Sequence, residues 1–112
     1  MTNDEQMQEI EVNIANARGK VADRDMLRNL LKNKDFERII MKLYLEEEAV
    51  RLVHLKSEPM EEVHKVSIDN KMYGIGALDR FFRSIMAEGS QMEIAIRESE
   101  EELEGMELGE IN

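Results

Sequence analysis

The sequence predicts an all-α protein of four to five helices, with a long N-terminal and a long C-terminal helix around a short helix pair. Three observations favour this hairpin-like or bundle-like class. Apolar residues recur at intervals of three and four along most of the chain, which places them on one face of a helix. A single proline interrupts 112 residues. Strands are conceivable only between residues 60 and 73, where no further strand is available to extend them.

The first predicted element is a long helix within residues 1–33. It is predicted by a stripe of apolar residues at alternating spacings of three and four. The stripe consists of Met7, Ile10, Ile14, Ala17 and Val21. The next two positions would be Arg24 and Arg28, so we expect the stripe to break there. The apolar side then moves to Ala22, Met26, Leu27, Leu30 and Leu31. Gly19 lies near this change and is a poor helix former, which predicts a bend or a break.

A short helix pair is expected over residues 35–56. Asp35 follows a polar stretch and is a good N-cap, because its carboxylate can accept the free amide hydrogens of the next turn. The inward face of the first helix is predicted to hold Phe36, Ile39, Ile40 and Leu43. The inward face of the second is predicted to hold Ala49, Leu52 and Val53. We expect this helix to end near Lys56, because Pro59 follows and the residue before a proline resists helical geometry.

Residues 60–73 allow two interpretations. Val63, Val66 and Ile68 are β-branched, and residues 66–73, with a turn at Asp69-Asn70, could form a small hairpin. An isolated hairpin is marginally stable in water, so we favour a helix that is capped by Ser67 and runs to about residue 97. Its apolar positions, again at spacings of three and four, are Ile68, Met72, Ile75, Phe82, Ile85, Met86, Met92 and Ile96.

Charge is distributed unevenly along the chain. The 25 acidic and 15 basic residues give a formal net charge of −10. Residues 1–17 contain four acids and no base, residues 98–112 contain seven acids and no base, and residues 18–97 contain 14 acids and 15 bases. A block of like charges is typical of an exposed tail, so we expect an acidic flexible tail over 98–112. The single helical domain is then 1–97, with an N-terminal arm (1–33) and a body (34–97).

Composition narrows the class of protein further. The absence of cysteine excludes disulfides and thiolate metal sites. A hydrophobic content of 42% is enough for a folded core, but no apolar run is long enough to cross a membrane. The acidic N-terminus lacks the basic and apolar regions of a signal peptide. We therefore expect a soluble protein that does not contact membranes.

Two segments of the chain resemble a family of small, acidic, all-helical proteins encoded by tailed bacteriophages. The segments are residues 34–59 and 75–86, about half of the chain. The residues that carry the resemblance are Asp35-Phe36, Tyr44-Leu45, Glu48-Ala49, Arg51-Leu52-Val53, Pro59 and Ile75-Gly76-Ala77-Leu78. The resemblance implies a helical fold and a phage context. It carries no catalytic motif onto this chain, because these are packing and capping residues.

Catalytic and metal-binding motifs are scarce. Glu61 and His64 form one Glu-x-x-His pair, whereas the di-iron four-helix proteins use two such pairs and two further glutamates. The other histidine, His54, has Arg51 three residues before it, so the pair is not repeated. No Ser-His-Asp set, P-loop or His-Glu-x-x-His motif occurs. We predict that the protein is not an enzyme and has no catalytic residue, cofactor or metal.

Apolar stripes longer than a compact body needs predict self-association or docking on a partner protein. Phe81 and Phe82 project about 100° apart on a helix, so both are covered only if that helix is contacted on more than one side. Flexible methionines also suit adaptable binding surfaces, although they can equally fill the core. The candidate interaction residues are Met7, Ile10, Ile14, Val21, Met72, Ile75, Phe81, Phe82, Ile85 and Met86.

Nucleic acid is not an expected partner. A basic strip from Arg18 to Arg28 is interleaved with Asp23 and Asp25, and both acidic ends would repel phosphates. We expect a non-catalytic interaction protein of a tailed phage, an accessory of virion assembly or structure that acts as a homo-oligomer in the host cytoplasm or the virion. The alternative is an inhibitor of a host enzyme or defence system that mimics DNA. Mimicry needs carboxylates arrayed on a folded surface, and the expected body is nearly neutral, so the acidic ends would have to act.

Overall fold

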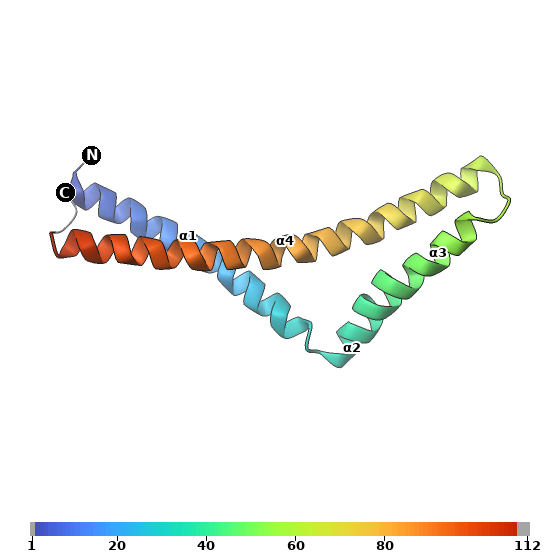
Figure 1. Ribbon diagram of the computed structural model, residues 1–112, viewed down its shortest axis with the longest axis horizontal. Coiled ribbons are helices and arrows are strands. Elements are labelled where there is room, and N and C mark those ends of the chain that lie inside the picture. The colour runs from blue at the N-terminus through green and yellow to red at the C-terminus, as the bar shows by residue number, and fades with distance from the viewer. Residues whose placement is uncertain (1, 110–112) are drawn as a thin grey trace. The chain divides into compact units, whose positions relative to one another are not determined.

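The computed structural model describes residues 2–109, and all of its regular structure is helical (Figure 1). The elements in chain order are α1 (Asn3–Leu30), α2 (Lys34–Phe36), the π-helix η1 (Glu37–Glu48), α3 (Ala49–Lys56) and α4 (Glu62–Glu107). The all-α class is confirmed. Because α2, η1 and α3 follow one another without a break, the described part of the chain contains three continuous helical segments in place of the predicted four to five.

Most helix ends follow local capping rules, with one difference from the prediction. The residue that caps α2 is Asn33, whose side chain accepts a hydrogen bond of 3.0 Å from the amide of Phe36. Asp35, the predicted cap, lies inside the first turn. Thr2 caps α1 through its hydroxyl, which accepts from the amide of Glu5 at 3.1 Å. No break occurs at Gly19, because α1 is helical from Asn3 to Leu30.

Residues 66–73 are helical, so the hairpin interpretation is wrong and the helical one is confirmed. The helix α4 begins at Glu62, five residues before the predicted cap at Ser67, and runs for 46 residues. Ser57 closes the preceding α3, where its hydroxyl donates to the carbonyl of His54 at 2.6 Å. Pro59 then lies in the short connection between α3 and α4.

The chain divides into two units, both of which include part of α4. The terminal unit comprises Met1–Leu27 and Ile85–Asn112, and the central unit comprises Arg28–Ser84. Each contains an antiparallel helix pair. The division separates charge, because the terminal unit has 15 acids and four bases (−11) and the central unit has ten acids and 11 bases (+1). From the sequence we expect a nearly neutral body between two acidic ends. In the structure the two ends belong to the same unit, so the chain consists of one nearly neutral unit and one strongly acidic unit.

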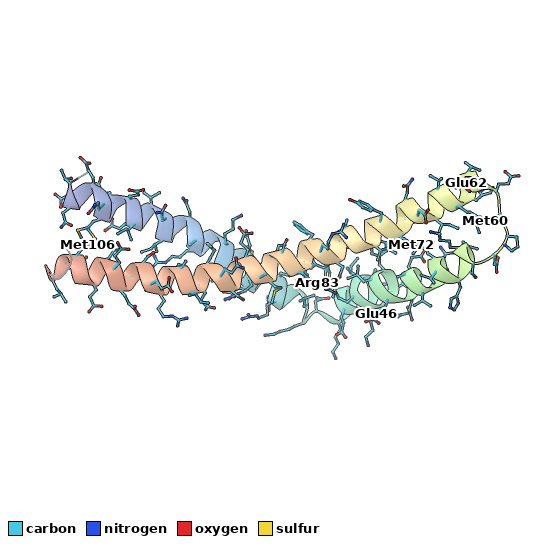
Figure 2. The ribbon with its side chains drawn as sticks, turned by 45° about the horizontal axis from the view of Figure 1, so that its top comes forward. Glu46, Met60, Glu62, Met72, Arg83 and Met106 are labelled. Atoms are coloured by element: carbon cyan, nitrogen blue, oxygen red, sulfur yellow. The ribbon has the colours of Figure 1, made fainter. Side chains whose placement is uncertain are left out.

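The core of the central unit lies between η1–α3 and the first half of α4. Leu52 is fully buried, and Ile68 and Ile75 are 5% and 6% exposed. Half-buried side chains that pack against this cluster are Tyr44, Leu45, Ala49, Leu55, Met60 and Met72. Figure 2 labels Met60 in the connection before α4 and Met72 on α4. Lys56 pairs with Asp69 across the two helices, and Phe36 contacts Phe82 with ring centroids 6.0 Å apart.

The π-helix η1 explains why the predicted inward face was partly wrong. A π-helix joins residues i and i+5, so each turn holds more residues than an α-turn. The side chains that are at least half-buried accordingly recur at four and five: Phe36, Ile40, Met41, Tyr44, Leu45, Glu48 and Ala49. Ile39 and Leu43, predicted to face inward by α-helical spacing, are 53% and 42% exposed. Val53 of α3, also predicted to face inward, is 51% exposed.

In the terminal unit, α1 lies along the C-terminal half of α4 (Figure 1). Ile14, Ala17 and Leu27 are buried on α1, as is Arg24, which is 4% exposed. The sequence predicted that the buried stripe of α1 would break at Arg24. This prediction is wrong, because Arg24 is itself buried and occupies the next position of the stripe. Gly89 makes room for it. A Cβ on Gly89 would lie 2.8 Å from the Cδ of Arg24 and closer still to its Cβ.

The predicted flexible tail is wrong for residues 98–107, which belong to α4. Two contacts explain why this acidic segment is helical. Met106, which is labelled in Figure 2, is 5% exposed. Glu100 accepts a hydrogen bond of 2.9 Å from Arg18 of α1. Gly109 has a positive φ of 74°, which suits a residue just past a helix end. Residues 110–112 of the expected tail lie outside the described residues.

Candidate binding surfaces

The ten candidate interaction residues differ widely in exposure. Ile14 and Ile75 are buried at 6% exposure, and Phe81 is 58% exposed. The other seven are half-buried: Met7, Ile10, Val21, Met72, Phe82, Ile85 and Met86. Phe82 contacts Phe36 within the central unit, whereas the ring of Phe81 touches that of Phe82 at 6.3 Å and remains largely open to solvent.

An exposed apolar face runs along α4 in the central unit, and we call it the outer face of α4. It consists of Val63, Val66, Tyr73 and Phe81, which are 65%, 49%, 72% and 58% exposed. The guanidinium of Arg80 lies 5.5 Å from the centre of the Tyr73 ring, a cation–π distance. The sequence does not single out this face, because the β-branched Val63 and Val66 are equally typical of a strand. Their spacing of three, followed by seven to Tyr73, is the signal that could have found it.

A second feature of the central unit is an open groove between η1 and α4, with a volume of about 570 Å³. The exposed Ile39 and Leu43 line it from η1, and Gly74 lines it from α4. A Cβ on Gly74 would lie 3.7 Å from the Tyr44 hydroxyl, so this side chain lies directly beside the glycine. The groove is therefore an apolar surface that the π-helical turn leaves open.

One charged pair borders this groove. Arg51 donates from Nε to Glu48 at 3.0 Å, and a second contact joins its Nη2 to the same carboxylate. The hydrogen bonds from Arg51 lower the pKa of Glu48, and they raise the pKa of Arg51 above its usual value. The pair is held in its charged form at neutral pH, which suits a structural role.

The terminal unit has its own groove, of about 450 Å³, between α1 and α4. Its apolar lining comes from Ile14 and Ala17 of α1 and from Met92, Ala95 and Ile96 of α4. Small polar residues complete it, and Lys20 and Glu88 form an ion pair of 3.6 Å at one end. Several of its lining side chains are small, which leaves space between the two helices.

Ion pairs join the two helices of the terminal unit. Arg24 donates to Glu93 at 2.8 Å and to its neighbour Asp25 at 2.9 Å, and these hydrogen bonds raise the pKa of Arg24. Arg18 pairs with Glu100 at 2.9 Å. Three of the four bases in this unit are thus already paired with carboxylates of the same unit. Most acids among the described residues of this unit form no ion pair and remain available to a partner.

Glu61 and His64 are both exposed near the start of α4. Within residues 2–109, no three histidine or acidic side chains come close enough to hold a metal ion. The same residues include no helix with the length and apolar content needed to cross a membrane. The distinctive features of the described chain are thus its exposed apolar surfaces and its separation of charge.

Comparisons with family models, with curated proteins and with solved structures return no match. The resemblance to phage proteins therefore remains a prediction from the residues quoted for it.

Proposed function

We propose that the protein is a non-catalytic interaction protein that associates with a protein partner, including a second copy of itself, through the central unit. One observation carries this proposal. Among residues 2–109, thirteen large hydrophobic side chains are exposed, whereas seven hydrophobic residues are buried. Large exposed apolar patches on soluble proteins mark interaction surfaces.

The central unit is the part suited to self-association. Its net charge of +1 imposes little repulsion between copies. The outer face of α4 presents four large apolar side chains on one helix, which is the arrangement by which helices pair. Following the resemblance, we place this activity in a tailed phage, as an accessory of virion assembly or structure in the host cytoplasm or the virion.

The test is the molar mass of the purified protein, measured by size-exclusion chromatography with light scattering. We expect a mass above 13.0 kDa that falls to the monomer value in the double variant Tyr73→Lys/Phe81→Lys. The matched control is Val12→Lys/Ile94→Lys, which replaces residues of similar exposure in the terminal unit and should keep the oligomer. A monomeric wild-type protein that also captures no virion protein would contradict the proposal.

A second candidate function, inhibition of a DNA-binding enzyme by acidic mimicry, is favoured by the folded terminal unit. Residues 3–27 of α1 span about 37 Å at 1.5 Å per residue. The described residues of the unit carry a net charge of −10, which over that length is one charge per about 3.7 Å, close to the spacing of one DNA strand and about half the density of the duplex. The described carboxylates of this unit thus lie on α1 and α4, where mimicry can use a folded surface.

Competition with DNA tests the second candidate. An inhibitor of this kind should protect DNA from a host nuclease or restriction enzyme, and protection should weaken as salt rises. Glu101→Gln/Glu104→Gln should reduce protection, whereas Tyr73→Lys/Phe81→Lys should leave it unchanged. Equal protection by all variants would contradict mimicry.

A further inference from the structure

We propose that the groove of the terminal unit binds a cationic amphipathic helix of a partner protein. This inference does not rest on self-association, because it concerns the other unit. The lining of the groove shows which surface can fill it, and the acids around the groove show which charge that surface carries.

The floor of the groove suits the apolar face of a helix. Ile14, Met92 and Ile96 supply apolar contact, and Ala17 and Ala95 are too small to block the approach of another backbone. Helices pack with their axes about 8–10 Å apart, with the shorter distances where the contacting side chains are small. A third helix laid between α1 and α4 would therefore cover apolar surface that the pair alone leaves open.

Acids continue this surface along both helices. Residues seven apart lie on nearly the same face of a helix. Glu9 and Asp23 lie seven residues before and after the lining residue Asn16, and Glu102 lies seven after Ala95. All three are exposed, and none forms an ion pair within residues 2–109. The lysine at the groove, Lys20, is already paired with Glu88.

Charge then selects the occupant. A second terminal unit would bring −11 against −11, and nucleic acid would be repelled in the same way. A helix with an apolar stripe and flanking lysines or arginines would bury its stripe on the floor and place its cations beside Glu9, Asp23 and Glu102. Helix-in-groove recognition of this kind is a recurring mode of peptide binding.

The experiment uses the full-length protein and a labelled 18-residue helical peptide of leucine and lysine, with leucine at the a and d positions of each heptad. Binding is followed by fluorescence anisotropy. The comparison peptide has the same composition in scrambled order, which keeps the charge and removes the apolar stripe. We expect the patterned peptide to bind at least about tenfold more tightly, because only its stripe can cover the floor.

Two sets of variants locate the site. Glu9→Gln/Glu102→Gln should weaken binding of the patterned peptide about tenfold, because the lost carboxylates would face its lysines. The matched control Glu101→Gln/Glu104→Gln removes two charges from other faces of α4 and should change affinity by less than about threefold. Asn16→Arg, at an exposed position in the groove lining, should also weaken binding by placing a cation against the peptide.

Equal binding of the patterned and scrambled peptides would overturn the proposal, since charge alone would then account for it. Equal effects of the two glutamine pairs would overturn it as well, because the groove would not be the site. A change in oligomeric mass with Asn16→Arg would assign the groove to a second copy instead. None of these outcomes bears on Tyr73→Lys/Phe81→Lys, so failure here is distinguishable from failure of self-association.

Discussion

At the scale of single residues, Gly89 and Gly19 illustrate opposite uses of the same amino acid. The absent side chain of Gly89 makes room for Arg24, whereas a Cβ on Gly19 would meet nothing within 4 Å. The new methyl group of Gly89→Ala would clash with the side chain of Arg24, starting at its Cβ, which cannot move without its helix. We therefore expect this substitution to lower the free energy of unfolding by about 1–3 kcal/mol. Gly19→Ala should raise it by about 1 kcal/mol through helix propensity alone.

Urea denaturation followed by circular dichroism measures the free energy of unfolding of both glycine variants. Two changes of the same sign would show that Arg24 does not pack against Gly89 in solution. The position of Arg24 also explains why its prediction failed. An arginine in an apolar stripe normally marks the end of that stripe, and the sequence does not show that a glycine 65 positions later would accommodate it.

Glu48 gives the molecule a pH dependence whose direction is set by Arg51. The pKa of Glu48 is lowered in the folded state by the hydrogen bonds from Arg51. When folding lowers the pKa of a carboxyl group, the stability that results is complete at pH values above the pKa of that group in the unfolded chain. This stability is lost as pH falls through the pKa of the group in the folded protein. We therefore measure the urea concentration at the unfolding midpoint at pH 7 and at several values between pH 5 and 3. As pH is lowered, this midpoint should fall less in Glu48→Gln than in the wild type. An equal fall would show that the pair contributes nothing.

At the scale of elements, the end of α4 is the part of the fold that the sequence described least well. The block of like charges in residues 98–112 predicts an exposed tail, but it does not show that Met106 is buried within the terminal unit. We expect Met106→Ala to lower the free energy of unfolding by about 2 kcal/mol, as for other buried methionines. Leu108→Ala, at a side chain 66% exposed, should change it by less than about 0.5 kcal/mol. Equal effects of the two substitutions would return this segment to the status of a flexible tail.

The long helices and their buried stripes could be predicted from the sequence, and the π-helix could not. Spacings of three and four identified the stripe through Met7, Ile14 and Val21, and α1 bears it out with Ile14 buried. The same spacings predict that Ile39 and Leu43 face inward, which is wrong because these spacings hold for α-helical turns and not for the wider turns of a π-helix. Intervals of four and five between apolar residues are present in the sequence. They do not predict a π-helix, because an α-helix can also contain an interval of four and π-helices are rare.

At the scale of the whole molecule, the net charge follows from the composition, but only the fold shows which acidic residues lie close together. The acids of residues 4–11 and 98–107 are remote in sequence, yet α1 and the end of α4 bring them into one unit. The binding surfaces were predictable only in part. Phe81 was singled out and is exposed, whereas Val63, Val66 and Tyr73 were not, because their face becomes visible only once the buried face of α4 is known.

Self-repulsion in the terminal unit predicts a response to salt. The Debye length falls from about 30 Å at 0.01 M salt to about 8 Å at 0.15 M, so repulsion among the 15 acids should weaken. We expect amide hydrogen exchange in α1 to slow over this range and exchange in α3 to stay constant, because the central unit has a charge of +1. Faster exchange in α1 would mean that the loss of its ion pairs outweighs the relief of repulsion.

The π-helix has a consequence for how the chain can change by deletion. A wide turn is equivalent to an α-turn into which one residue has been inserted, so η1 holds more residues than its length requires. Loss of one residue between 37 and 48 would let the segment relax toward α-helical geometry with its ends still joined to α2 and α3. The side chains before and after the deletion would then rotate relative to each other. A single codon lost here would redraw the apolar surface of the central unit and leave its topology intact.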